Sequence, residues 1–247
     1  MDRMLYLAMS TAKQTMEAQA VNTNNLANAS TTGFKADLEQ FRSMPVYGEG
    51  MPSRVYAMTE RPGVDMRPGS INSTGRELDT AVLGEGWIAV QARDGSEAYT
   101  RAGDLRIDST GMLTTGAGHP VIGSSGAPIT VPPAETLQIG ADGTISIRPV
   151  GQAASTLAEV DRIKLVKPDP AQLHKGEDGL IRLSDGSTAP ADASVVLVSG
   201  SLEGSNVSGV EAMVRMIELQ RQYEMQVKMM STAKENDGAT DQLLKVT

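Results

Sequence analysis

The chain has 247 residues, of which 40% are hydrophobic and 21% charged, a composition typical of a globular protein with one large or two modest domains. Its formal net charge is −8 and it has no basic run, which disfavours nucleic acid as a partner because phosphate binding requires clustered Lys and Arg. It contains no cysteine, which excludes disulfides and thiolate metal sites.

The first twenty residues, MDRMLYLAMSTAKQTMEAQA, lack the continuous apolar stretch of a Sec-type secretory signal. We therefore expect no cleavable signal peptide. No segment approaches the roughly 18 consecutive apolar residues that a membrane-spanning helix needs, and we expect nothing to span a bilayer.

Residues 3–29 contain neither proline nor glycine and predict a long helix. Its apolar residues recur at spacings of four, three and four, which is typical of a helix that packs on another helix. They are Leu5, Met9, Ala12 and Met16. We expect these residues to form the packing seam.

The end of this helix is rich in asparagine, a weak helix former because its amide competes for the backbone. These asparagines are Asn22, Asn24, Asn25 and Asn28. Gly33 then suits a left-handed helix cap, and Phe34 is expected to anchor the exit of the chain.

The middle of the chain changes character. Residues 34–74, with their prolines and glycines, predict an extended linker with little core of its own. Residues 75–200 hold short apolar runs separated by turns and predict an all-β domain of many short strands, with Trp87 in its core. The strongest turn signals, of which the first is expected to join two hairpin strands, are Asp94-Gly95, Asp142-Gly143, Asp178-Gly179 and Asp185-Gly186.

Residues 201–247 predict a second helix, from Ser208 to about Asp237. Ser208 and Glu211 have the spacing of a capping box, and Gly238 is expected to interrupt the helix. The apolar residues form a band wide enough to imply burial on more than one side. They are Val210, Met213, Val214, Met216, Ile217, Leu219, Tyr223, Val227 and Met230.

Together these elements predict an α+β fold in four parts. The two terminal helices each lack a partner unless the other supplies it, so we expect them to pair into a coiled-coil-like stalk that carries the β domain. The expected parts are a helix at 1–33, a linker at 34–74, a β domain at 75–200 and a helix at 201–247.

Three stretches occur in a characteristic order: NNLANASTTGFK from Asn24, GWIAVQ…YTRAGDLRIDSTGMLTT…GHPVIG from Gly86, and LEGSNVSGVEAMVRMIELQRQYEMQVKMMST from Leu202. They resemble the bacterial flagellar rod and hook proteins over nearly the whole chain. The patterns N-x-A-N-x-x-T-x-G-[FY] and L-E-x-S-N-V are specific to that family. Gly204, the PVIG hairpin and the length favour a proximal-rod member, with a distal-rod member as the alternative.

The resemblance implies a structural subunit that is exported unfolded through the flagellar type III apparatus. It implies polymerisation with copies of itself and with other rod proteins into the axial drive shaft that crosses the periplasm in the basal body. The terminal helices would form the inner wall of this tube. The resemblance implies neither a cofactor nor a small-molecule substrate.

We therefore predict a set of subunit-interface residues on the two helices and their flanking motifs. Buried amides carry both donors and acceptors, so the asparagines would be tolerated in one alignment only. The predicted interface residues are Leu5, Met9, Met16, Asn22, Asn24, Asn25, Asn28, Gly33, Phe34, Asn206, Val207, Val210, Met213, Ile217, Tyr223, Val227 and Met230.

Two alternatives to a rod subunit belong to other classes of function. The two histidines, His119 and His174, lack further ligands at metal-site spacing, and no nucleophile–base arrangement is recognisable, so we expect no catalysis. The second alternative is a periplasmic binding or adhesion module that oligomerises through its helices. A convergent polar pocket in the β domain would favour it.

Overall fold

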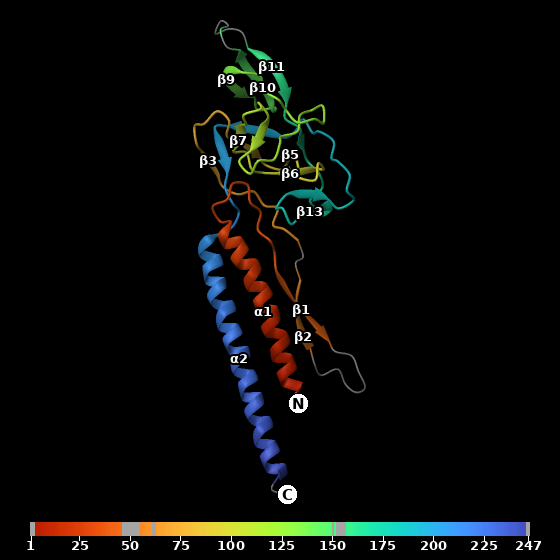
Figure 1. The fold of residues 1–247 in the computed structure, drawn as a ribbon, viewed down its shortest axis with the longest axis vertical. Coiled ribbons are helices and arrows are strands. Elements are labelled where there is room, and N and C mark those ends of the chain that lie inside the picture. Colours follow the sequence, from red (N-terminus) through yellow and green to blue (C-terminus); the bar gives the residue numbers. More distant parts are fainter. Residues whose placement is uncertain (1–2, 46–54, 61–62, 150, 152–156, 246–247) are drawn as a thin grey trace. The chain divides into compact units, whose positions relative to one another are not determined.

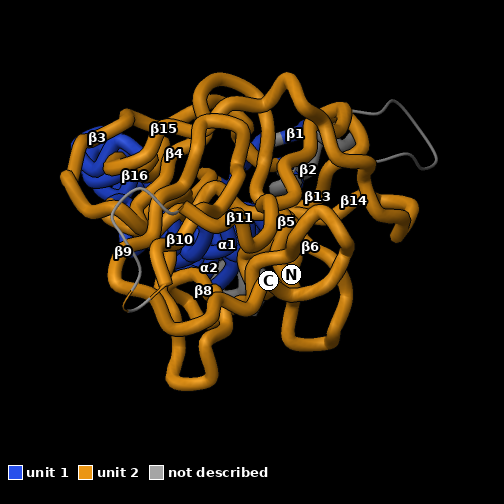
Figure 2. Tube along the Cα trace, turned by 90° about the horizontal axis from the view of Figure 1, so that it is seen from above, with its two compact units in different colours: residues 1–29, 37–63, 207–247 blue, residues 30–36, 64–206 orange. Residues whose placement is uncertain are grey.

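The computed structural model describes residues 3–45, 55–60, 63–149, 151 and 157–245. Within these residues there are two long helices and sixteen short strands, so the predicted α+β fold is confirmed (Figure 1). The chain forms two compact units, coloured separately in Figure 2. Unit 1 comprises residues 1–29, 37–63 and 207–247, and unit 2 comprises residues 30–36 and 64–206.

Unit 1 contains both helices and one pair of strands. Helix α1 (Arg3–Ala27) lies alongside α2 (Gly209–Lys245) and also contacts β2 (Val55–Glu60). Strand β1 (Gln40–Pro45) pairs with β2 in antiparallel register, with Gln40 opposite Glu60. Much of the segment predicted as a linker is therefore part of the helical unit, although its residues 46–54 and 61–62 lie outside the described part of the chain.

The packing face of α1 is made of small residues, and the predicted seam is wrong in part. Ala8, Ala12 and Thr15 are buried, whereas Met9 and Met16 are 54% and 56% exposed. Small side chains allow a neighbouring helix to approach closely, and each methionine lies one position around the helix from the residue that is buried. Of the predicted seam, Ala12 is buried and Leu5 is half-buried.

Both helix ends differ from the prediction. Helix α1 ends at Ala27, where the Asn28 N–H donates to the Asn24 carbonyl (3.1 Å), so Gly33 is not its cap, although Gly33 does have the expected left-handed φ of 67°. Helix α2 continues through Gly238 to Lys245. One exposed glycine costs a helix only about 1 kcal/mol, which is too little to end it.

The predicted start of α2 is confirmed. The Ser208 hydroxyl accepts a hydrogen bond from the Glu211 N–H at 3.4 Å, and the Ser208 carbonyl accepts from the Ala212 N–H at 2.9 Å. Ser208 therefore satisfies backbone donors that would otherwise lack a partner in the first turn.

Unit 2 is built from short antiparallel strands. Its largest sheet has the order β12-β5-β6-β14-β13, and a second sheet has the order β11-β10-β9. Three further pairs are β15-β4, β16-β3 and β7-β8. The strand bounds are β3 (Ile71–Ser73), β4 (Thr80–Leu83), β5 (Trp87–Gln91), β6 (Glu97–Thr100), β7 (Leu105–Ile107), β8 (Leu113–Thr115), β9 (Ala134–Ile139), β10 (Thr144–Pro149), β11 (Ala158–Arg162), β12 (Leu165–Val166), β13 (Leu173–Lys175), β14 (Ile181–Leu183), β15 (Val196–Ser199) and β16 (Ser201–Glu203), with a 3-10 turn at Pro170–Gln172.

Two apolar clusters hold these sheets together. The larger joins residues of β5, β8 and β10, including Ile88, Leu113 and Ile145, all fully buried. The smaller contains Trp87 and Tyr99, so the prediction that Trp87 lies in the core is confirmed. Nearly all buried side chains here are aliphatic, in keeping with an aromatic content of only 3%.

The Asp-Gly pairs lie at the turns as predicted. Asp94-Gly95 joins β5 to β6, Asp142-Gly143 joins β9 to β10, and Asp178-Gly179 joins β13 to β14. The three glycines have φ values of 84°, 87° and 80°, which favour glycine because it has no Cβ.

The turn carboxylates are hydrogen-bonded to the residue two positions further on. Asp94 accepts from the backbone N–H and hydroxyl of Ser96, and Asp142 accepts in the same way from Thr144. These hydrogen bonds to the ionised form hold the pKa of Asp94, and likewise of Asp142 and Asp185, below the ordinary carboxyl value.

We predict that unit 2 loses stability in acid. Each of these carboxyls has a lower pKa in the folded chain than in the unfolded one, so its stabilisation is present above the ordinary pKa of 3.8 and is lost as the pH falls through the folded pKa. Urea unfolding followed by fluorescence of Trp87 should give a falling free energy of unfolding between about pH 5 and about pH 2. The triple variant Asp94→Asn, Asp142→Asn and Asp185→Asn should flatten this dependence, and an unchanged slope would contradict the role given to these three carboxyls.

Candidate functional site

A buried carboxylate lies where the N-terminal and C-terminal motifs meet in unit 2. Glu203 is the last residue of β16, and it is 0% exposed. Lys35 follows the Gly33-Phe34 pair of the first motif, and Arg101 follows β6. The side chains of both cations are 3% exposed. We refer to Lys35, Arg101 and Glu203 as the ion cluster.

The geometry of the ion cluster places one cation on each carboxylate oxygen. Lys35 Nζ lies 2.7 Å from Glu203 Oε1, and Arg101 donates from its guanidinium to Glu203 Oε2 at 2.8 Å. The Gly69 N–H also donates to Oε1, at 3.0 Å. Burying a single unpaired charge this completely would cost much free energy, because the charge loses its hydration. Here the ion pairs and the hydrogen bonds offset that loss.

The indole of Trp87 adds an aromatic face to the cluster. The Arg101 guanidinium carbon lies 5.2 Å from the ring centroid, and Lys35 Nζ lies 5.9 Å from it, both within the range of a cation–π interaction. Burial lowers the pKa of Lys35 below 10.5, and its hydrogen bond to Glu203 opposes that shift.

Backbone hydrogen bonds bring the two motifs together around the ion cluster. The Gly33 N–H donates to the Glu203 carbonyl at 2.8 Å, and the Asn206 N–H donates to the Phe34 carbonyl at 3.3 Å. Lys175 Nζ donates to the Lys35 carbonyl at 2.9 Å and lies 4.0 Å from the centroid of the Phe34 ring. Phe34 therefore has a defined place in unit 2.

Three of the four asparagines predicted near the end of α1 form side-chain hydrogen bonds inside the chain, and Asn24 is exposed. Asn22 is buried in unit 1 and donates to the Ala212 carbonyl of α2 at 2.8 Å. Asn25 exchanges two hydrogen bonds of 2.9 Å with the backbone of Asp37. The Asn28 amide donates to the carbonyl of Asn24 one turn earlier.

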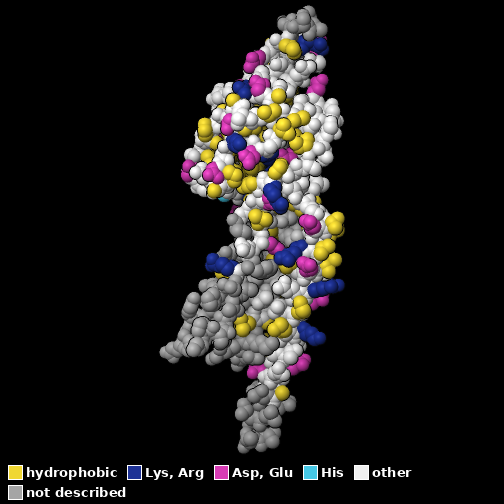
Figure 3. Space-filling model, turned by 180° about the vertical axis from the view of Figure 1, so that it is seen from behind, with side chains coloured by type: hydrophobic (Ala, Val, Ile, Leu, Met, Phe, Trp, Pro, Cys, Tyr) yellow, Lys and Arg dark blue, Asp and Glu magenta, His cyan; other side chains and the backbone are white. Residues whose placement is uncertain are grey.

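The predicted apolar interface residues divide into two groups. Half-buried in unit 1 are Leu5, Val207, Tyr223 and Met230. Figure 3 shows hydrophobic side chains exposed between charged ones along the helices of unit 1. The exposed members of the predicted set are Met9, Met16, Val210, Met213, Ile217 and Val227.

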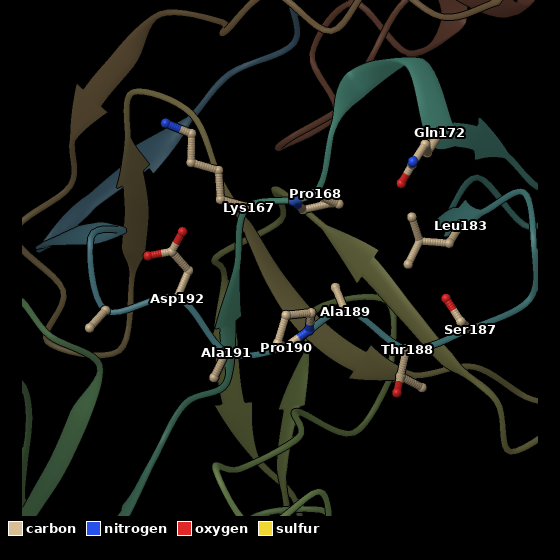
Figure 4. A pocket seen from close by; sticks show the side chains of 11 residues that line it. Lys167, Pro168, Gln172, Leu183, Ser187, Thr188, Ala189, Pro190, Ala191 and Asp192 are labelled. Atoms are coloured by element: carbon tan, nitrogen blue, oxygen red, sulfur yellow. The ribbon is translucent and has the colours of Figure 1, made fainter.

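A cavity of about 380 Å³ in unit 2 bears on the alternative of a binding module. Its charged side chains, Lys167 and Asp192, lie on one side, with Gln172 and Leu183 on the other (Figure 4). Lys167 is directed to a surface ion pair with Glu85, at 3.1 Å, so no buried charged group converges on the cavity. Such a cavity lacks the convergent polar groups expected of a ligand site.

Among the residues that the structure describes, no group of three or more His, Cys, Asp or Glu side chains is arranged to hold a metal ion. Neither helix, over its described length, is apolar enough to cross a membrane.

Comparison with known families assigns three parts of the chain. Residues 5–35 match the flagella basal body rod protein family, residues 81–147 match the flagellar hook protein FlgE/F/G D1 domain, and residues 198–243 match the flagellar basal body rod FlgEFG protein C-terminal family. The flagellar basal-body rod protein FlgF of Escherichia coli is 47% identical over 253 residues, covering all of both chains. The chain belongs to the family of flagellar basal-body rod proteins.

Other rod proteins are similar over nearly the same length. FlgF of Salmonella typhimurium is 46% identical over all of both chains, and FlgG of Bacillus subtilis is 32% identical over 94% of this chain and 96% of its own. The prediction that the chain is a structural subunit of the basal-body rod is confirmed, and full-length similarity to rod proteins leaves the binding-module alternative without support.

Sequence reasoning missed the ion cluster of this rod protein. Each of its three members lies in a different family match: Lys35 in the first, Arg101 in the second and Glu203 in the third. The signal was available, because each charge stands within a motif of small and apolar residues, in TTGFK, TRAG and LEGSNV. Opposite charges in such surroundings are typical of a buried pair.

We predict that Glu203→Gln destabilises unit 2 by about 3–5 kcal/mol, because it leaves two buried cations without a counter-charge. Chemical unfolding monitored by Trp87 fluorescence measures this loss. The matched control is Glu97→Gln, which removes a half-buried pair with Lys164 (2.8 Å) outside the ion cluster. Equal losses for the two variants would contradict a special role of Glu203.

We also predict different costs for two glycines of similar conformation. Gly33 (φ 67°) and Gly75 (φ 71°) both require a left-handed backbone, but a Cβ at Gly33 would overlap the backbone of Arg101 and Ala102, whereas a Cβ at Gly75 would meet nothing within 4 Å. Gly75→Ala should cost about 1–2 kcal/mol, and Gly33→Ala should cost a further 1–3 kcal/mol or so for the overlap. The same unfolding measurement compares them, and indistinguishable costs would show that the close approach is unimportant.

Proposed function

We propose that α1 and α2 pair as a coiled coil and that this helical unit polymerises with copies of itself and with other rod proteins into the axial drive shaft. The pairing is supported by residues of α2 that recur at alternating spacings of four and three and are buried or half-buried. They are Ala212, Met216, Leu219, Tyr223, Gln226, Met230 and Ala233. Such a repeat is typical of left-handed helix pairing.

Helix α1 carries two rows of this kind. One row, which includes Asn22, faces α2 and consists of Leu5, Ala8, Ala12, Thr15, Gln19 and Asn22. The second row includes Asn25 and consists of Leu7, Thr11, Gln14, Ala18, Val21 and Asn25. Contacts of α1 with both α2 and β2 are in keeping with burial along two rows.

The surface for neighbouring subunits is proposed to be the apolar part of the helices that their own chain leaves exposed. Val210 is 74% exposed, and Met213, Val214 and Ile217 are also exposed, all within the first part of α2. Several exposed apolar side chains close together on a protein surface are typical of an interaction site. Since a rod is an open helical assembly, each subunit would present this surface to a different surface of its neighbour.

We further infer that the chain has no enzymatic activity, is exported unfolded by the flagellar type III apparatus, and lies in the periplasmic part of the basal body. The family membership supports this proposal. Nucleic acid is not expected among its partners because the chain carries a net charge of −8.

The single observation that carries this proposal is full-length similarity to rod proteins. An in-frame deletion of the gene tests it. The expected result is loss of swimming, with isolated basal bodies that stop before a complete rod in electron micrographs. Complete rods in the deletion strain would contradict the proposal.

We predict that Ile217→Glu abolishes rod assembly while the free subunit still folds, because this side chain is exposed in the single chain and would be desolvated between subunits. Circular dichroism and Trp87 fluorescence should match those of the natural protein, and motility should be lost. The control is Ile107→Glu, a similarly exposed isoleucine of unit 2, which should leave assembly intact. Normal rods with Ile217→Glu would show that this surface is not part of the interface between subunits.

A further inference from the structure

The chain passes between its two units at four places, after residues 29, 36, 63 and 206. Any force that the covalent chain carries between the units enters each unit through the residues next to these crossings. How those residues are bonded inside each unit therefore decides whether a pull displaces one segment or all of them together.

In unit 2 the residues next to the crossings are bonded to one another. The Asn206 amide donates to the carbonyls of Asp65 (2.8 Å) and Arg67 (3.1 Å) and accepts from the Ala36 N–H (2.8 Å). The Asp65 N–H in turn donates to the Ala36 carbonyl at 2.8 Å. One side chain thus joins all three segments that reach the crossings.

The ion cluster connects the same segments to the sheets of unit 2. Lys35 donates to the Arg67 carbonyl at 2.8 Å as well as to Glu203. Arg101, on the other side of the carboxylate, donates to the Gly84 carbonyl next to β4 at 2.7 Å. A pull on residue 36, 64 or 206 is therefore transmitted to the β core through short, directional bonds.

In unit 1 the other ends of the crossings are bonded in a similar way. Asn25, near the end of α1, exchanges two hydrogen bonds with the backbone of Asp37. The next residue, Leu38, donates from its N–H to the Gly63 carbonyl at 3.0 Å. Asn22 donates to a carbonyl in the first turn of α2 at 2.8 Å.

We propose that these two sets of bonds, centred on Asn25 in unit 1 and on Asn206 in unit 2, are clamps that make the four crossings carry torque together. The proposal rests on the proposed function as a subunit of a rotating shaft. Crossings whose flanking segments are bonded to one another share a load, whereas segments without such bonds would be displaced one at a time. Amide side chains suit this role because each joins two or three backbone groups at once.

The test uses full-length chains carrying Asn25→Ala, Asn206→Ala or both, expressed in place of the natural gene. The controls are Gln40→Ala and Asn72→Ala, exposed amide side chains in the same two units. Rotation is followed with a large and a small bead attached to the flagellum, and basal bodies are counted by electron microscopy. We expect normal numbers of complete basal bodies, near-normal rotation of the small bead, and loss of rotation of the large bead, most strongly in the double variant.

Either of two results would contradict the proposal that these bonds are clamps. One is unchanged rotation of the large bead in the double variant, and the other is absence of complete rods, which would place these asparagines in assembly instead. Complete rods in the deletion strain would contradict the proposed function itself. That outcome can be told apart from a failure of the clamp proposal, because the load dependence of rotation is scored only in strains with complete basal bodies.

Hydrogen exchange on the purified full chain provides a second measurement. Asn206→Ala should raise exchange in residues 30–36, 64–69 and 201–206 together and leave β9 and β10 unchanged, because one side chain joins the three segments. A rise confined to residues 201–206 would mean that the segments are held independently and would overturn the clamp in unit 2.

Discussion

The buried carboxylate of Glu203 sets the conditions that the rest of unit 2 must meet. A charge without solvent is tolerated only with partners of opposite sign and with its hydrogen-bonding capacity filled, which here requires Lys35, Arg101 and the Gly69 N–H. Lys35 can reach the carboxylate only if the chain turns at Gly33, where a side chain would overlap the backbone of Arg101. The ion cluster thus determines where the N-terminal motif must lie, and a hydrophobic cluster of the same size would impose that position less strictly.

Much of the fold could be predicted because the relevant signals are local. Long runs without proline or glycine indicated both helices, and Asp-Gly pairs indicated the hairpin turns, since each signal reflects the conformational preference of one or two residues. The packing face of α1 could not be predicted in this way. Hydropathy favours Met9 and Met16 over Ala8 and Thr15, but close approach of a neighbouring helix favours the small residues.

The asparagines and the ion cluster illustrate a second limit of sequence reasoning. The amides of Asn22 and Asn25 were predicted to need defined partners between subunits, and in the single chain their partners are backbone groups 190 and 12 residues away. Lys35 and Glu203 are 168 residues apart, and no local pattern pairs them. Only the placement of both charges within motifs of small and apolar residues pointed to burial, and that signal does not identify which charge meets which.

Polar and apolar side chains therefore have different roles in this rod protein. Inside a single chain, the directional groups, Asn22, Asn25 and Asn206 among them, fix where each segment lies, and they leave the larger apolar residues of α2 free to remain exposed. Apolar contact is tolerant of small shifts, which suits a proposed surface that must fit neighbours of more than one kind. A subunit whose own shape is set by hydrogen bonds can accept such adaptable contacts at its outer surface without losing the geometry through which torque is proposed to pass.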